Sequence, residues 1–291
     1  MGEPIRGKEA LEALAKCFPQ LYVPVSEDSA EAYARAARRG VAPDNANLAH
    51  FQGSDDDELV TVDTPAGPIE VLFLSTRSDF ETFLQIIGHK ACPVPILPEV
   101  GAITFRGLAD WMKVASALRA YTDAGGTDLA AEYARLAAEP GAIRSELIVI
   151  SAGPYSNVPA HEAGYDEAEW LRVSRDIRLY HECAHVVCRR LMPDDILPVW
   201  DEVTADVVGL ICATGGYDPE LAARFLGVGP QGYAGGRLEE YLDKERRDRI
   251  DSAAEEAYAA QLRVAEMVSA DDLAHPFDFL LALKRKPLLS F

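Results

Sequence analysis

Residues 180–187 read Tyr-His-Glu-Cys-Ala-His-Val-Val, and this stretch decides how the rest of the chain is interpreted. It contains the pattern His-Glu-x-x-His, with His181 and His185 four positions apart. On an α-helix, side chains at this spacing lie on one face with Cβ atoms about 5–6 Å apart. Both imidazoles can therefore reach one metal ion at about 2.0–2.1 Å. Glu182, one step round the helix, can hold a water molecule bound to that metal.

The flanking sequence favours a helix over residues 166–191. Asp166, followed by Glu169, predicts an N-terminal cap and an acidic first turn. Apolar residues then recur at steps of three and four, so both histidines fall on or beside the buried face. Two arginines in the last turn suit the negative end of the helix dipole, and Pro193 predicts the end of the helix.

A third metal ligand is expected from the next helix, residues 198–213, which begins at a proline. Glu202 and Asp206 are four apart, hence on one face, in a helix that is otherwise apolar and predicted to be buried. Two buried carboxylates are costly unless a cation or hydrogen-bond donors compensate them. A metal bound by Glu202, with Asp206 accepting from the far nitrogen of a histidine ligand, meets both requirements. The short loop 192–197 favours an antiparallel neighbour that returns Glu202 to the histidines.

These motifs resemble the gluzincin branch of the zinc metallopeptidases, over about residues 145–215. The Glu-x-x-Ala-Asp form of the second motif is similar to that of the CAAX-prenyl and heat-shock membrane proteases. It is also close to the Glu-x-x-Ala-Asn form of the small cytoplasmic peptidases that cleave phage repressors. The two motifs that carry the resemblance are His181-Glu182-x-x-His185 and Glu202-x-x-Ala205-Asp206.

The resemblance implies a zincin-like fold and a zinc-dependent metallopeptidase. It implies that His181, His185 and Glu202 hold the zinc ion and that Glu182 is the general base. Asp206 would contact a metal ligand, and not the metal itself, through a hydrogen bond. The substrate would be a peptide or a protein. The chain lacks the membrane spans of the prenyl and heat-shock proteases, so their substrates are not carried over.

Two further features follow from the same resemblance. A strand beside the cleft precedes the motif helix in such enzymes and pairs with extended substrate, and residues 146–151 are the expected counterpart. The developing oxyanion needs a donor. Arg237 and Tyr241, four apart at the start of a long helix expected over residues 236–268, are the candidates. A surface ion pair and a core aromatic are the alternative interpretations of these two residues.

The chain as a whole predicts an α+β fold in two regions. A mixed α/β region over residues 1–145 precedes a mainly helical, metal-binding region over residues 146–291, and we expect the two to pack as one unit because no linker separates them. The first region is expected to hold helices over residues 7–17, 28–39, 79–87, 107–121 and 127–138, a hairpin over 59–62 and 69–74, and a strand near 103–105. The second is expected to add helices over 166–191, 198–213, 218–226 and 236–268.

The composition limits the classes of partner and the compartment that we expect for this protein. Against 28 Lys and Arg stand 47 Asp and Glu, a net charge of −19, which disfavours nucleic acids and anionic membranes. The sequence shows neither a signal peptide nor an apolar run of the roughly 20 residues that a membrane span needs. Five cysteines among mostly apolar neighbours are typical of reduced core thiols, so we expect a cytoplasmic protein.

Other candidate ligands have simpler explanations. Cys183 projects away from the face of the two histidines and Cys188 continues that face, and core packing is favoured over ligation for both. His50, His89 and His161 are interpreted as ordinary solvated or capping histidines. An alternative function stays open, in which the zinc is structural and the protein is a non-catalytic module that binds a partner. A fourth protein ligand, such as a cysteine, would favour that alternative.

Overall fold

The structure is a computed structural model that describes residues 3–98, 100–192 and 197–289. The chain folds into two compact units. Unit 1 comprises Met1–Val62 and Ile69–Ser151, and unit 2 comprises Asp63–Pro68 and Ala152–Phe291. The expected α+β class is confirmed. The expected boundary at residue 145 lies six residues too early, because the strand that ends at Ser151 belongs to the sheet of unit 1. That the regions pack as one unit stays a prediction.

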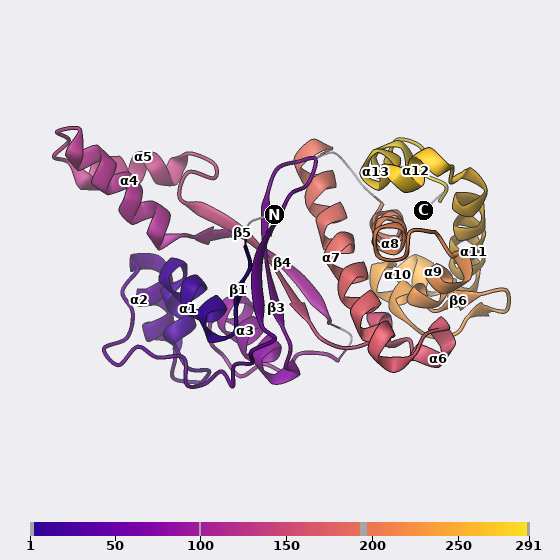
Figure 1. Cartoon of the computed structure of the whole chain (residues 1–291), viewed down its shortest axis with the longest axis horizontal. Helices are drawn as coiled ribbons and strands as arrows, with labels where there is room; N and C mark the ends of the chain where they lie inside the picture. Colours follow the sequence, from indigo (N-terminus) through magenta and orange to yellow (C-terminus); the bar gives the residue numbers. More distant parts are fainter. Residues whose placement is uncertain (1–2, 99, 193–196, 290–291) are drawn as a thin grey trace. The chain divides into compact units, whose positions relative to one another are not determined.

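Unit 1 is built on a five-stranded mixed sheet with strand order β1-β2-β3-β5-β4 (Figure 1). The predicted hairpin is present, because β2 and β3 are antiparallel neighbours. Strand β5 lies parallel to β3, and its apolar run from Leu147 to Ile150 is buried throughout, as expected of a strand covered on both faces. The strands are β1 (Ile5–Arg6), β2 (Glu58–Val62), β3 (Ile69–Leu74), β4 (Ala102–Ala109) and β5 (Arg144–Ser151).

The expectation that residues 146–151 pair with extended substrate is wrong. Leu147 already pairs with Glu70 of β3 on one side and with Phe105 of β4 on the other. A strand bonded to neighbours on both sides has its backbone donors and acceptors committed, so it cannot add an extended peptide. β-Branched residues are typical of edge strands and of central strands alike. The sequence alone therefore did not show which of these two positions residues 146–151 occupy.

Helices of unit 1 begin and end near the expected positions. One difference concerns the predicted helix 107–121, whose first residues instead continue β4 beyond an irregularity between Phe105 and Leu108. The helix starts at Trp111 because the side chain of Asp110 accepts hydrogen bonds from the backbone N–H groups of Met112 and Lys113. The helical elements are α1 (Lys8–Cys17), η1 (Pro19–Tyr22), α2 (Ala30–Arg39), α3 (Arg77–His89), α4 (Trp111–Asp123) and α5 (Leu129–Ala138).

Unit 2 is mainly helical and is organised around α8 (Pro198–Thr214), which packs against α7 (Glu167–Leu191). The predicted cap of α7 is confirmed, since the carboxylate of Asp166 accepts from the N–H of Glu169 at 2.8 Å. Pro193, the predicted end of α7, and most of the loop 192–197 lie outside the described residues. Figure 1 shows α8 surrounded by other helices of the unit. These other elements are η2 (Tyr155–Asn157), α6 (Ala160–Ala163), α9 (Pro219–Leu226), β6 (Val228–Gly229), β7 (Gly232–Tyr233), η3 (Arg237–Tyr241), α10 (Lys244–Arg247), α11 (Ile250–Met267), α12 (Ala270–Ala274) and α13 (Pro276–Lys284).

The single long helix expected over residues 236–268 is wrong, because the segment forms three shorter helical elements. Leu242 is extended after η3, and Asp243 then caps α10 by accepting from the N–H of Arg246. Arg249 leaves helical geometry before α11 begins at Ile250. Asp243 has good capping chemistry and competes with helix continuation here, which the apolar periodicity did not reveal.

Helix α8 approaches α7 closely at Gly209. A Cβ built on Gly209 would lie 2.8 Å from the carbonyl oxygen of Ile177. The pairs that meet along the two helices, His185 with Asp201 and His181 with Asp206, run in opposite directions, as expected for an antiparallel neighbour. The absence of a side chain at Gly209 thus allows the close approach that brings these groups together.

We predict that Gly209→Ala destabilises the protein by about 1–3 kcal/mol, because the added methyl group must push two packed helices apart. Gly216→Ala is the matched control, since a Cβ at Gly216 meets nothing within 4 Å. Urea unfolding of both variants measures the difference. Equal stability of the two would show that the helices tolerate the displacement.

No helix within residues 3–98, 100–192 or 197–289 has both the length and the apolar character that a membrane span needs.

Candidate metal centre

Three side chains from α7 and α8 converge on one point of unit 2. In the part of the chain that the structure describes, His181, His185 and Glu202 form a group whose ligand atoms all lie within 4.8 Å of one another. The Nε2 atoms of the two histidines are 3.0 Å apart, and each lies 3.4 Å from one oxygen of Glu202. The three residues predicted as metal ligands are thus brought together.

The orientation of both imidazoles is set by carboxylates behind them. Nδ1 of His181 lies 2.8 Å from Oδ1 of Asp206, and Nδ1 of His185 lies 2.9 Å from Oδ2 of Asp201. A carboxylate accepts hydrogen bonds, so each Nδ1 donates, and in a neutral ring Nε2 then carries a lone pair. Each histidine therefore aims an acceptor toward the other histidine and toward Glu202.

Two lone pairs and a carboxylate facing one another at 3.0–3.4 Å repel unless a cation lies between them. In a tetrahedral zinc site with bonds of about 2.0–2.1 Å, the ligand atoms lie about 3.3 Å apart. The donor set of two imidazoles and one carboxylate suits zinc in both chemistry and spacing. The residues present therefore fit a divalent metal ion.

The pKa of His181 also indicates that the centre favours a positive charge. Burial opposes its protonation, but hydrogen bonds to Asp206 and Glu202 outweigh burial and raise its pKa to about 10. The pKa of Glu202 is lowered to about 2, because the interactions with His181 overcome burial. A positive charge at the centre is thus strongly favoured, and without a metal a proton on His181 provides it.

Asp206 is completely buried and is held by two further groups. The hydroxyl of Tyr155 donates to its Oδ1 at 2.5 Å, and the guanidinium of Arg237 donates to its Oδ2 at 2.7 Å. Burial raises the pKa of a carboxyl group, but here Arg237 and the bond with His181 dominate and lower the pKa of Asp206 to about 2. Asp206 therefore stays ionised, and it lies behind His181, where the sequence analysis expected it to support a ligand.

Asp201 performs the corresponding role for His185 and was not among the residues predicted from the sequence. Its second partner is the ammonium group of Lys284, the last residue of α13. Burial opposes ionisation of Asp201, but its contacts with His185 and Lys284 prevail and hold its pKa below the usual range. The signal was available, because a histidine ligand usually bonds a carboxylate or carbonyl through its other nitrogen, and Asp201 directly precedes Glu202.

Arg237 and Tyr241 both lie at this centre, on η3 rather than on a long helix. Arg237 donates to Asp206, lies 3.6 Å from Glu202, and donates through Nε to the carbonyl of Phe225 at 3.1 Å. Its side chain is 15 % exposed, so it is a counter-charge within the site rather than a surface ion pair. Burial raises the pKa of Tyr241, and a hydrogen bond with Glu202 adds to that rise. Donation to an oxyanion stays a prediction for both.

The position of Arg237 depends on a close approach between the backbone of Gly227 and the backbones of Gly235 and Gly236. A Cβ on Gly227, at the end of α9, would lie 2.1 Å from the carbonyl oxygen of Gly235, and one on Gly236 would lie 2.8 Å from Cα of Gly227. Gly227 also has a positive φ of 73°, which glycine adopts without strain. This passage places η3 beside Phe225. The sequence did not point to these glycines, because no local pattern shows that Gly227 meets Gly235 and Gly236.

Glu182, the predicted general base, is half-buried on α7 directly after His181, and its catalytic role stays a prediction. The other candidates agree with their simpler interpretations. Cys183 and Cys188 are buried free thiols outside the ligand group, and burial raises their pKa values to about 12 and about 11. His50 bonds the carbonyl of Leu21, whereas His89 and His161 are exposed.

The charges around the centre also favour a cation. Three carboxylates, those of Asp201, Glu202 and Asp206, face two cations, Lys284 and Arg237. These five side chains leave one negative charge, so the centre attracts a positive ion.

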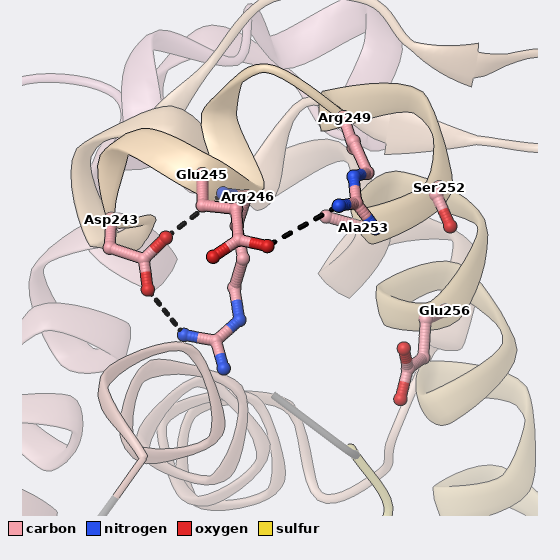
Figure 2. Close-up of a pocket in the computed structure, with 7 residues that line it drawn as sticks. All are labelled: Asp243, Glu245, Arg246, Arg249, Ser252, Ala253 and Glu256. Carbon is pink, nitrogen blue, oxygen red and sulfur yellow. Dashed lines mark hydrogen bonds and ion pairs between the residues drawn. The ribbon is translucent and has the colours of Figure 1, made fainter.

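Unit 2 also contains a pocket formed by α10, α11 and the residues beside them (Figure 2). Its charges are paired locally, since Arg246 lies 2.6 Å from Asp243 and Arg249 lies 3.3 Å from Glu245. These side chains are exposed, so the ion pairs contribute little. None of the predicted site residues lines this pocket.

Residues 4–262 match the model of a family of unknown function, DUF7005. The chain belongs to the DUF7005 family. No curated protein and no solved structure matches it significantly. The stretch that matches DUF7005 includes all three candidate ligands and Arg237, whereas Lys284 lies beyond it.

We predict that metal binding displaces a proton. Because the pKa of His181 is about 10 without metal, its ring is protonated at neutral pH and must lose that proton to become a ligand. The apparent zinc affinity should rise about tenfold per pH unit between pH 6 and 8. Competition with a chromophoric chelator, corrected for the chelator's own titration, measures this slope. An affinity independent of pH would contradict the arrangement described.

Proposed function

We propose that this protein is a zinc-dependent hydrolase and that it acts as a metallopeptidase. The observation that carries the proposal is the group of three protein ligands, His181, His185 and Glu202, with both histidines oriented by carboxylates. Catalytic zinc sites typically have three protein ligands and leave the fourth position to water or substrate, whereas structural sites are closed by four. In the described residues the group contains no cysteine and no fourth His, Asp or Glu.

The reaction would be hydrolysis of a peptide bond. A zinc ion held by His181, His185 and Glu202 would supply a Lewis acid that polarises the scissile carbonyl and lowers the pKa of a water molecule. Glu182 accepts the proton of the attacking water and later donates it to the leaving amine. Asp206 and Asp201 keep each imidazole in the tautomer that offers Nε2 to the metal.

Arg237 and Tyr241 are the candidate donors to the oxyanion. Arg237 shares its guanidinium with Asp206 and with the carbonyl of Phe225, so it acts first as the counter-charge of the buried carboxylate. Tyr241 adjoins Glu202, which would place its hydroxyl next to a ligand of the metal.

The proposal extends to the substrate and to the cellular compartment. The resemblance to the gluzincins favours a zincin-like fold and a peptide or protein substrate. All five cysteines are free thiols, which favours a reducing compartment and hence the cytoplasm. The alternative, a structural zinc in a partner-binding module, is separated from the enzyme by the variant below.

We predict that Glu182→Gln lowers peptide hydrolysis by about a hundredfold to ten-thousandfold, because the amide cannot accept the proton. The zinc content and the melting temperature should stay those of the wild type, since Gln has nearly the same shape. Glu167→Gln, at an exposed position in the first turn of the same helix, is the matched control and should keep full activity. Cleavage of a mixed peptide library, read by mass spectrometry, measures both.

Full activity of Glu182→Gln would overturn the proposed role of Glu182. If the wild type carries zinc and cleaves none of the peptides, the structural alternative is favoured.

A further inference from the structure

Helix α13 is fastened to the first turn of α8 at two adjacent points. The indole N–H of Trp200 donates to the carbonyl of Leu283 at 3.2 Å, and the ammonium group of Lys284 bonds Oδ1 of Asp201. The Lys284 side chain is 2 % exposed. An ammonium group buried to this extent is costly unless it is paired, whereas an apolar side chain would pack there without that cost. A lysine at this position therefore calls for an explanation beyond packing.

The bond to Lys284 continues toward the metal centre. Asp201 offers one oxygen to Lys284 and the other, Oδ2, to Nδ1 of His185 at 2.9 Å. Lys284 thus occupies one side of the carboxylate and leaves the other side facing the imidazole. The Asp201 side chain is 27 % exposed, so without Lys284 it can rotate toward water. His185 would then lose the partner that holds its ring.

We propose that Lys284 is a positioning residue of the metal centre, which acts through Asp201 to hold His185 in its ligating orientation. The inference rests on the metal site of the proposed function but not on its hydrolytic activity. It assigns α13 a role in the site, although α13 lies beyond the stretch that matches the family model. Each histidine is then supported by a carboxylate that a cation holds in place, since Asp206, the partner of His181, bonds Arg237.

The direction in which zinc affinity changes when Lys284 is removed distinguishes a positioning role from a purely electrostatic one. Lys284 is a positive charge near a bound cation, so its removal by itself would strengthen metal binding. If Lys284 instead acts by orienting Asp201, its removal weakens binding, and arginine, which can bond the same oxygen, restores it.

The experiment compares Lys284→Met, Lys284→Arg and Lys286→Met in the full chain. Methionine keeps the length of the buried stem without the charge, and Lys286 is an exposed control two residues away. Zinc affinity is measured by chelator competition, the release of zinc by its rate into excess chelator, and the ligand geometry by the visible spectrum of the Co²⁺-loaded protein.

We expect Lys284→Met to lower zinc affinity about tenfold, to speed zinc release and to alter the Co²⁺ spectrum, as is typical when a group that supports a ligand is lost. Lys284→Arg should recover most of the affinity, and Lys286→Met should match the wild type. In an Asp201→Asn background, which itself should lose about tenfold to a hundredfold, Lys284→Met should add little.

Unchanged or tighter zinc binding by a folded Lys284→Met protein would overturn the inference while leaving the proposed function intact. If Lys284→Met does not fold, Asp201→Asn decides, and wild-type affinity in that variant would equally overturn it. A wild-type protein that takes up neither zinc nor Co²⁺ would instead remove the metal site, and with it both proposals.

Discussion

Two imidazole nitrogens that face each other at 3.0 Å, with a carboxylate beside them, form the constraint on which the rest of unit 2 depends. Two neutral rings in this arrangement repel, so a positive charge stabilises the site, supplied by a bound metal ion or, without one, by a proton on His181. Around this requirement the protein arranges two more carboxylates, and it balances those with Lys284 and Arg237. The elements that carry the two cations, α13 and η3, come late in the chain and pack on α8.

Local features were largely predictable from the sequence. The cap at Asp166, the hairpin of β2 and β3, the extents of α7 and α8, and the convergence of Glu202 on the two histidines follow from short-range chemistry and helical periodicity. A buried helix with two carboxylates four positions apart was informative because such groups need partners. That need pointed to a metal and to a histidine nitrogen.

Long-range features were not predictable in the same way. Whether residues 146–151 form an edge or a central strand depends on which strands lie on either side, and β4 and β3 come from distant parts of the chain. The break of the expected helix 236–268 depends on Asp243, whose capping competes with a periodic pattern. The close passage of Gly227 and Gly236 and the contact of Lys284 with Asp201 are meetings in space that no local pattern encodes. Asp201 is the intermediate case, because the requirement that each histidine ligand have a partner could have identified it.

The measurement that tests the central claim most directly is the zinc content of the natively purified protein beside that of its Glu202→Ala variant. The account predicts about one zinc ion per chain in the wild type, and loss or marked weakening of zinc binding in the variant, since Glu202 is one of three ligands. A folded wild-type protein that contains no metal and takes up no added zinc would contradict the account. The convergence of the histidines and Glu202 would then be a feature of helix packing alone.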